Sequence, residues 1–227
     1  MSKSISVKNF LPAILLIVAV CVLSRVPVQS RPMTSEDVAR MRWVAETAIS
    51  PDGKLIAYTV MVQRNPFVDE NGSAWRELHV VDPEGNSRPF ICAPVKVTNI
   101  QFTPDGNYIS YLSERDDDSQ KSLYIIPTGG GESRKLLEFH SDIKDYAWAP
   151  DGREIAFLAT EKLSPVVDSL EEMGFDQDVY EEDWRPVRIW IWDTADSSAS
   201  PRMLDIDESA DDVYWSPDGT LLATALA

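Results

Sequence analysis

Apolar residues in this chain gather in short runs, and the same turn-forming tripeptide recurs between runs. The tripeptide Pro-Asp-Gly occurs four times, beginning at Pro51, Pro104, Pro150 and Pro217, at intervals of 53, 46 and 67 residues. A large apolar residue and then a small one precede each copy, and an apolar run follows it. Proline presets φ for a type I turn, and glycine accepts the left-handed backbone that opens the next strand. Each copy therefore predicts a β-hairpin, with a weaker third turn because Ala149 lacks the hydroxyl found at that place in the other three.

Two more strands are predicted after each of the first three hairpins. The third strands of the repeats are expected at Glu77–Asp82, Ser122–Pro127 and Arg188–Asp193, and the fourth at Arg88–Phe90, Arg134–Leu136 and Arg202–Leu204. Turn residues separate the two sets. Four antiparallel strands in a unit of roughly 45–50 residues are typical of a β-propeller blade.

The predicted fold is therefore all-β, a partial β-propeller of about three and a half four-stranded blades. The blades are expected at about 44–92, 97–138 and 143–205, with an incomplete one at 211–227. Near-continuous apolar strands suit sheets that neighbouring blades cover on both faces. A two-sheet sandwich with chance Pro-Asp-Gly turns is the alternative.

Two inserts and a lead-in interrupt the regularity. The segments 62–75 and 161–187 lengthen the first and third blades, and long ordered loops often carry function. In the lead-in, 31–43, Thr34 followed by acidic residues predicts a short helix to about Arg42.

The first thirty residues have the pattern of a secretory signal peptide. Lys3 and Lys8 precede an apolar run from Phe10 to Leu23, and a small residue, Ser30, ends the segment. An uncleaved anchor is the alternative, although fourteen apolar residues are short for a span of about twenty, and lipidation at Cys21 is another. We expect an exported protein, periplasmic or secreted, that meets a membrane only through an uncleaved signal.

The charge of the chain limits the partners that are expected, and its cysteine content limits the disulfides. Removing residues 1–30 leaves 18 basic against 37 acidic residues, a formal charge of −19. Such a chain would be repelled by phosphate backbones, so nucleic acid is not an expected partner. Only Cys92 would remain, so no internal disulfide is predicted.

No catalytic, cofactor or metal site is predicted within this sequence. No glycine begins the Gly-x-Ser-x-Gly motif of a hydrolase nucleophile elbow. His79 falls on a strand column and His140 in a linker, so neither is expected to be catalytic. The acidic run 205–212 lacks the spacing of an EF-hand loop, which leaves calcium only a weak alternative.

The chain resembles the N-terminal propeller of the prolyl oligopeptidase family of serine peptidases, particularly acylaminoacyl-peptidase and dipeptidyl-peptidase-like members. The resemblance covers residues 33–227 and is carried by the lead-in 33–37, by 49–54, by 74–80 and by the later Pro-Asp-Gly repeats. The periplasmic propeller of the Tol system has similar repeats. In the peptidases, the propeller caps an α/β-hydrolase domain with a Ser-Asp-His triad.

The resemblance also implies a substrate contact. The segment 178–184 is similar to one in which two adjacent glutamates bind the α-amine of the substrate, which points to Glu181 and Glu182. A solvated acidic loop is the alternative.

The expected function is that of a non-catalytic propeller portion that filters and positions short peptides for a C-terminal hydrolase domain absent from this chain. The chain alone is expected to hydrolyse nothing. The alternatives are a non-enzymatic, Tol-like envelope propeller that binds proteins, and a 227-residue natural product from a split or decayed gene.

Overall fold

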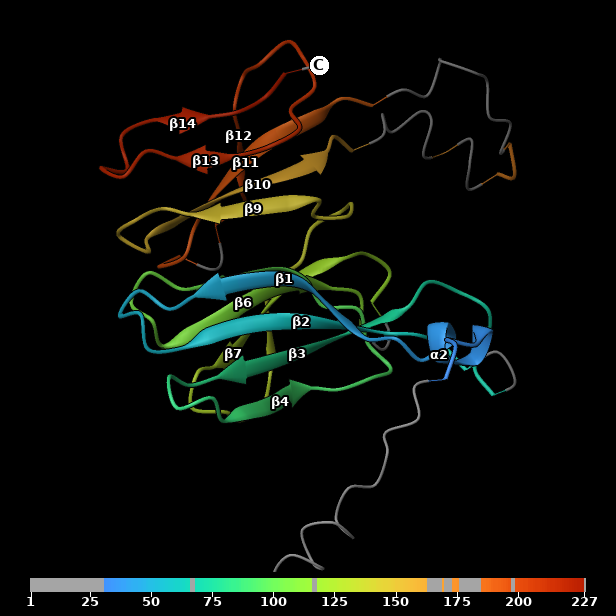
Figure 1. Cartoon of the computed structure of the whole chain (residues 1–227). Coiled ribbons are helices and arrows are strands. Elements are labelled where there is room, and N and C mark those ends of the chain that lie inside the picture. The colour runs from blue at the N-terminus through green and yellow to red at the C-terminus, as the bar shows by residue number, and fades with distance from the viewer. Residues whose placement is uncertain are drawn as a thin grey trace, which may run out of the picture. The chain divides into compact units, whose positions relative to one another are not determined.

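The computed structural model describes residues 31–65, 68–115, 118–162, 169, 173–175, 185–196 and 199–226 (Figure 1). Two compact units divide the chain, 1–38 and 39–227. The signal-peptide prediction and Glu181 and Glu182 lie outside the described residues. In the described part of the chain, no helix is both long and apolar enough to cross a membrane.

The lead-in forms a helix that is shorter than predicted. Helix α2 spans Ser35–Ala39 and does not reach Arg42. Its start is capped as expected, because the Thr34 hydroxyl accepts the N–H of Asp37 and the Asp37 carboxylate accepts the N–H of Thr34. A one-turn helix is marginal by itself, and strand pairing from Trp43 onward takes the following residues.

The rest of the described chain is all-β, and its antiparallel sheets have the propeller-like arrangement expected from the repeats. Three sheets have four strands each, in the order in which the chain forms them, and a two-stranded sheet follows. The first sheet contains β1 (Trp43–Ile49), β2 (Ile56–Val62), β3 (Trp75–Val81) and β4 (Ser87–Ile91). The second contains β5 (Thr98–Phe102), β6 (Tyr108–Ser113), β7 (Ser122–Pro127) and β8 (Arg134–Leu137). The third contains β9 (Asp145–Trp148), β10 (Glu154–Thr160), β11 (Val187–Asp193) and β12 (Arg202–Met203), and the fourth β13 (Tyr214–Trp215) and β14 (Leu222–Ala223).

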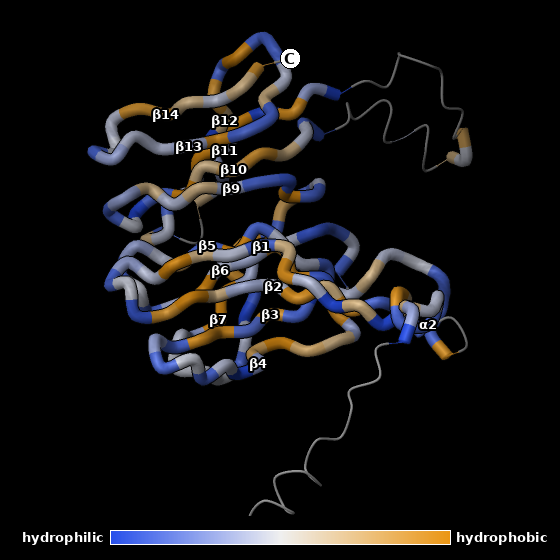
Figure 2. Tube along the Cα trace, in the orientation of Figure 1, coloured by the Kyte–Doolittle hydropathy of each residue, from blue (hydrophilic) through white to orange (hydrophobic). Residues whose placement is uncertain are grey.

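Three apolar clusters join successive sheets. Between the first two sheets, Leu78 and Val80 pack with Ile109 and Tyr111. The second and third clusters repeat this arrangement one sheet further along the chain. Hydrophobic segments follow the strands and hydrophilic ones the turns (Figure 2). Most of the free energy that holds the sheets together comes from burying these faces.

Each Pro-Asp-Gly segment connects the first two strands of its sheet. The glycine N–H donates to the carbonyl of the residue before the proline, at 2.8 Å in the first turn and 2.9 Å in the last. The four glycines have φ of 70° to 72°, a conformation that costs glycine little and other residues more.

A hydroxyl reinforces three of these turns. Ser50 Oγ donates to Asp52 Oδ1 at 2.7 Å and accepts the N–H of Leu55 at 2.9 Å. Thr103 and Ser216 make the same pair of contacts in the second and fourth turns. The hydrogen bond from Ser50, together with the N–H of Lys54, lowers the pKa of Asp52 to about 2. Ala149 provides neither contact.

The turns also contact one another. A Cβ atom placed on Gly106 would lie 3.6 Å from Cδ of Pro51, and one on Gly219 would lie 3.5 Å from Cδ of Pro150. Gly152 faces Pro104 in the same way, at 3.8 Å. Each of the first three prolines therefore packs beside the glycine of the next turn, and the hairpin tips form a row at the left of Figure 1.

We expect Ala149→Ser to stabilise the chain by about 1 kcal/mol, the typical net contribution of a hydrogen bond. The new hydroxyl would donate to Asp151 and accept the N–H of Glu154, as its equivalents do in the other turns. Ser50→Ala is the matched reverse change and is expected to cost a similar amount. Urea unfolding followed by tryptophan fluorescence measures both, and a destabilising Ala149→Ser would contradict this account of the turn.

Candidate functional site

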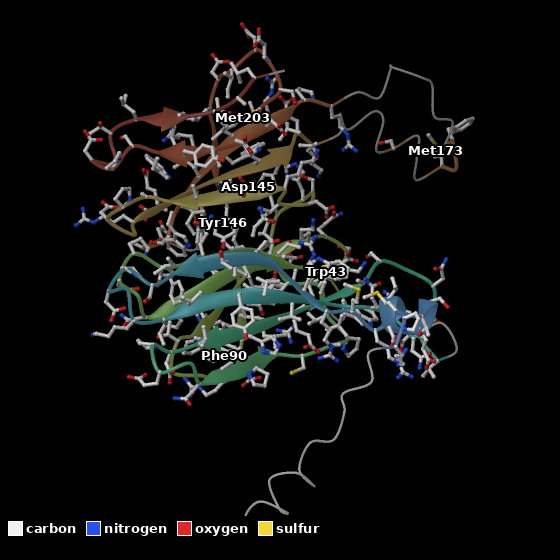
Figure 3. The ribbon with its side chains drawn as sticks, viewed as in Figure 1. Trp43, Phe90, Asp145, Tyr146, Met173 and Met203 are labelled. Carbon is white, nitrogen blue, oxygen red and sulfur yellow. The ribbon has the colours of Figure 1, made fainter. Side chains whose placement is uncertain are left out.

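The candidate site is a cavity of about 750 Å³ bordered by the first strands of all four sheets. Its polar lining includes Glu46 from β1, Asn99 and Gln101 from β5, and Asp145 from β9. Its aromatic lining consists of Tyr146, Trp148, Tyr214 and Trp215. Figure 3 shows Asp145 and Tyr146 on β9, beside the boundary with the first two sheets. Aromatic faces with a few polar groups are the usual lining of a site for small organic ligands.

Hydrogen bonds between sheets fix the walls of this cavity. Tyr146, which is fully buried, donates its hydroxyl to the carbonyl of Asn99 at 2.8 Å. In return, Gln101 Nε2 donates to the carbonyl of Tyr146 at 2.6 Å. Trp215 Nε1 makes the equivalent link to the third sheet through the carbonyl of Ala147, at 3.1 Å. The first strands are therefore held by directional bonds as well as by apolar packing.

Glu46 is the carboxylate that the first sheet contributes. Its Oε1 atom lies 2.8 Å from Arg76 NH1, and its Oε2 atom accepts the N–H of Ile100 at 3.3 Å. Because a cation of the protein already neutralises it, Glu46 positions β5 and leaves little charge for a ligand.

Asp145 differs because its hydrogen-bond donor is neutral. Asn99 Nδ2 donates to Asp145 Oδ1 at 2.8 Å, and Asn99 itself has a left-handed backbone with φ of 52°, which asparagine tolerates better than most residues. Burial, and secondarily the charge of Asp212, raise the pKa of Asp145, against the lowering effect of the Asn99 bond. A ligand with a cationic group would stabilise the charged, deprotonated form of Asp145.

A second cavity of about 500 Å³ shares Asn99 and Asp145 with the first. Lys144, Asp211 and Asp212 also line it, and so does Val187, the first residue of β11. The potential at this end of the site is therefore dominated by carboxylates, with one lysine opposing them.

The strand register places the long third-sheet insert at the same rim. Leu158 of β10 pairs with Asp145, and Thr160 pairs with Val187. The two ends of the insert are joined by an ion pair, Arg188 Nε to Glu161 Oε1 at 2.6 Å. The segment that contains Glu181 and Glu182 thus begins and ends beside Asp145, on the rim opposite the Pro-Asp-Gly turns.

Sequence reasoning missed Asn99 and Asp145. In each repeat a large apolar residue stands two positions before the proline of Pro-Asp-Gly. Three positions before that apolar residue, the four repeats all carry a polar side chain: Glu46, Asn99, Asp145 and Asp212. That polar column within otherwise apolar strands was the available signal.

The two histidines lie outside both cavities. His79 stacks on Tyr58, with ring centroids 5.4 Å apart, and its Nε2 lies 3.2 Å from Glu77 Oε2. His140 contacts Phe139 and Trp190, and its Nε2 lies 3.0 Å from the carbonyl of Thr160. Among the described residues, no group of three or more His, Cys, Asp or Glu side chains is placed to hold a metal ion.

Two peptidases are similar to this chain in sequence. The chain is 29% identical over 150 residues to the uncharacterized peptidase YuxL of Bacillus subtilis, a match that covers 66% of this chain and 22% of YuxL. It is 26% identical over 136 residues to dipeptidyl-peptidase 5 of Porphyromonas endodontalis, covering 60% and 19% of the two chains. The matched region is thus about a fifth of the length of these relatives. No protein-family model matches the chain.

Solved structures share the fold. The acylaminoacyl peptidase of Pyrococcus horikoshii superposes with a TM-score of 0.56 at 13% identity, over 76% of this chain and 27% of that one. A TolB-type protein of Agrobacterium tumefaciens superposes with a TM-score of 0.50 at 16% identity, over 82% and 60%. The chain therefore has homologues named peptidases and a fold found in an acylaminoacyl peptidase and in a TolB-type protein.

We expect Asp145→Asn to make stability less dependent on pH. The pKa of the Asp145 carboxyl group is higher in the folded state than in the unfolded one, so protonation of this group stabilises the fold at pH values below the unfolded pKa of about 3.9. That stabilisation is lost as the pH rises through the folded-state pKa. The variant, neutral at every pH, should therefore gain stability relative to the parent as the pH rises from 3.5 to 7.

Urea unfolding at both pH values measures the difference, with Asp207→Asn, an exposed residue, as the control. If Asp145→Asn loses stability at neutral pH relative to acid, the carboxylate is stabilised in its charged form and this interpretation is wrong.

Proposed function

We propose that this chain is the propeller portion of a serine peptidase, in which it admits and positions short peptides and leaves hydrolysis to a hydrolase domain. The observation that carries the proposal is the sequence similarity to two peptidases, over 150 and 136 residues. The sequence holds no Gly-x-Ser-x-Gly motif, so the nucleophile would lie outside these 227 residues. Export through the N-terminal segment is part of the same proposal.

The cavity between the first strands suits such a role. Its aromatic groups offer apolar contact to peptide side chains, and Asn99 and Gln101 carry amides that resemble peptide groups in their hydrogen bonding. The carboxylate Asp145 favours a cationic end or side chain. A cavity of this volume accepts a few residues of extended peptide and excludes a folded domain.

We expect the purified chain to bind tri- and tetrapeptides without cleaving them. Binding should change the tryptophan fluorescence, because Trp148 and Trp215 line the cavity. Trp215→Phe should diminish that change, whereas Trp43→Phe, at a half-exposed site outside both cavities, should preserve it. Release of p-nitroaniline from aminoacyl or dipeptidyl substrates, or a lack of peptide binding, would contradict the proposal.

We further propose that Glu181 and Glu182 bind the α-amine of the peptide. The support is their place in an insert whose two ends lie at the acidic rim, beside Asp145, and the resemblance of 178–184 to an amine-binding segment. Hydrogen bonds to charged groups contribute about 1.5–3 kcal/mol.

The double variant Glu181→Gln, Glu182→Gln should therefore weaken binding of a free-amine peptide by at least about tenfold. It should leave the N-acetylated peptide unaffected. Asp207→Asn with Glu208→Gln is the matched control, since it removes another adjacent acidic pair. Equal losses for the free and acetylated peptides would remove the amine-binding role and leave the peptide-binding proposal intact.

A second candidate is a non-enzymatic envelope propeller that binds proteins. It is compatible with the superposition on the TolB-type protein, which covers 82% of this chain and 60% of that one. The same fluorescence titration separates the two, because a protein-binding module would not respond to tri- and tetrapeptides.

A further inference from the structure

The two cavities of the candidate site differ in the chemistry of their walls. The larger one, of about 750 Å³, has four aromatic side chains in its lining. The smaller one, of about 500 Å³, is lined by three carboxylates and one lysine and, among the described residues, by no aromatic side chain. A ligand that fills both cavities would therefore need an apolar group for the first and a cationic group for the second.

Asn99 and Asp145 stand where the two cavities meet, because both residues line both cavities. Asn99 Nδ2 donates to Asp145 Oδ1 at 2.8 Å, and the carbonyl of Asn99 accepts the hydroxyl of the buried Tyr146 at 2.8 Å. A neutral amide thus orients the carboxylate of Asp145 without cancelling its charge, which remains for a ligand.

The backbone is irregular at the same place. Among the described residues, Asn99 is the only one other than glycine that has a positive φ, 52°. The pairing of β5 with β6 shifts its register between Thr98 and Gln101, on either side of Asn99. Such irregularities turn a side chain away from the direction that a regular strand would give it, and they are common beside functional sites. Here the irregularity accompanies the contact of Asn99 with Asp145 in the next sheet.

The smaller cavity suits a basic side chain better than a bare ammonium group. Its volume exceeds what an α-amine needs, and Leu158 and Val187 line it together with the carboxylates. The side chains of lysine and arginine place their methylene groups against apolar surface and their charged ends against polar groups. Apolar and acidic groups in one cavity match both parts of such a side chain.

We propose that Asp145, held in place by Asn99, selects peptides in which a basic residue lies one or two positions from an aromatic or large apolar residue. The basic side chain enters the smaller cavity and reaches Asp145, and the apolar side chain lies against Trp148 and Trp215 in the larger one. Asn99 is a positioning residue, since it acts through Asp145. This selectivity rests on the proposed peptide-binding function and specifies its substrate class.

Two capped tetrapeptides test the selectivity by titration against the tryptophan fluorescence of the chain. Both have an N-acetyl and a C-terminal amide group, so neither carries a terminal charge, and both contain phenylalanine. One has lysine beside the phenylalanine and the other has norleucine, which keeps an aliphatic chain and lacks the ammonium group. The lysine peptide should bind about tenfold more tightly at about 0.15 M salt, which screens the charge of the rest of the chain.

Four variants locate the source of this preference. Asp145→Asn should bring the ratio of the two affinities close to one. Asn99→Gly accepts the φ of 52° and removes only the amide, so the ratio should fall by about threefold or more. Lys144→Gln removes the opposing cation from the smaller cavity and should raise the ratio. Asp207→Asn, at an exposed residue, is the control for net charge and should keep the parent ratio.

Urea unfolding of each variant checks the fold, and a purely structural role of Asn99 would lower stability without changing the ratio. If neither peptide binds, the proposed function fails and the selectivity fails with it. If both peptides bind equally well, the peptide-binding function stands and the selectivity is wrong. A preference that survives Asp145→Asn, or that falls equally in Asp207→Asn, belongs to the net charge of the chain and would overturn the role of Asp145.

Discussion

The architecture depends on the burial of sheet faces against neighbouring sheets. A four-stranded sheet built from near-continuous apolar strands is stabilised most when neighbouring sheets cover both of its faces. The second sheet shows the solution, with Tyr111 buried on one side and Leu112 on the other. The cavity exists because the first strands of successive sheets converge while their side chains leave a space between them. The cavity and the core are thus products of the same stacking.

Directional contacts specify how the sheets stack, which apolar burial alone does not do. The Tyr146 hydroxyl and the Gln101 amide cross the boundary between the second and third sheets in opposite directions. At the hairpin tips, prolines packed beside glycines set the spacing. A displaced sheet would leave the buried Tyr146 hydroxyl without an acceptor, a cost of about 1–3 kcal/mol. A few such directional contacts are enough to select one arrangement of the sheets, which apolar burial alone would leave open.

Much of this fold could be predicted from the sequence because its determinants are local. Pro-Asp-Gly encodes the turn whatever surrounds it, and the apolar runs located the strands, including Ser122–Pro127 with its bounds. The helix that was expected to reach Arg42 ended at Ala39, because pairing between Trp43 and Met61 is a distant interaction that no local signal shows. The site was hidden for the same reason. Asn99 and Asp145 are 46 residues apart, and their hydrogen bond exists only because equivalent positions of successive sheets are brought together.

The two rims of the stacked sheets differ in how much their sequence and length can vary. On the rim of the Pro-Asp-Gly turns, glycine must keep a positive φ beside a proline, so both sequence and length are restricted. The opposite rim joins second strands to third strands, and there a short connection in the second sheet replaces the long insert of the third. The ion pair between Glu161 and Arg188 closes the base of that insert, so the residues beyond it can change without disturbing the pairing of β10 and β11. The two ends of the insert lie near Asp145 of β9, and a change of sequence between them does not require the stacking of the sheets to change.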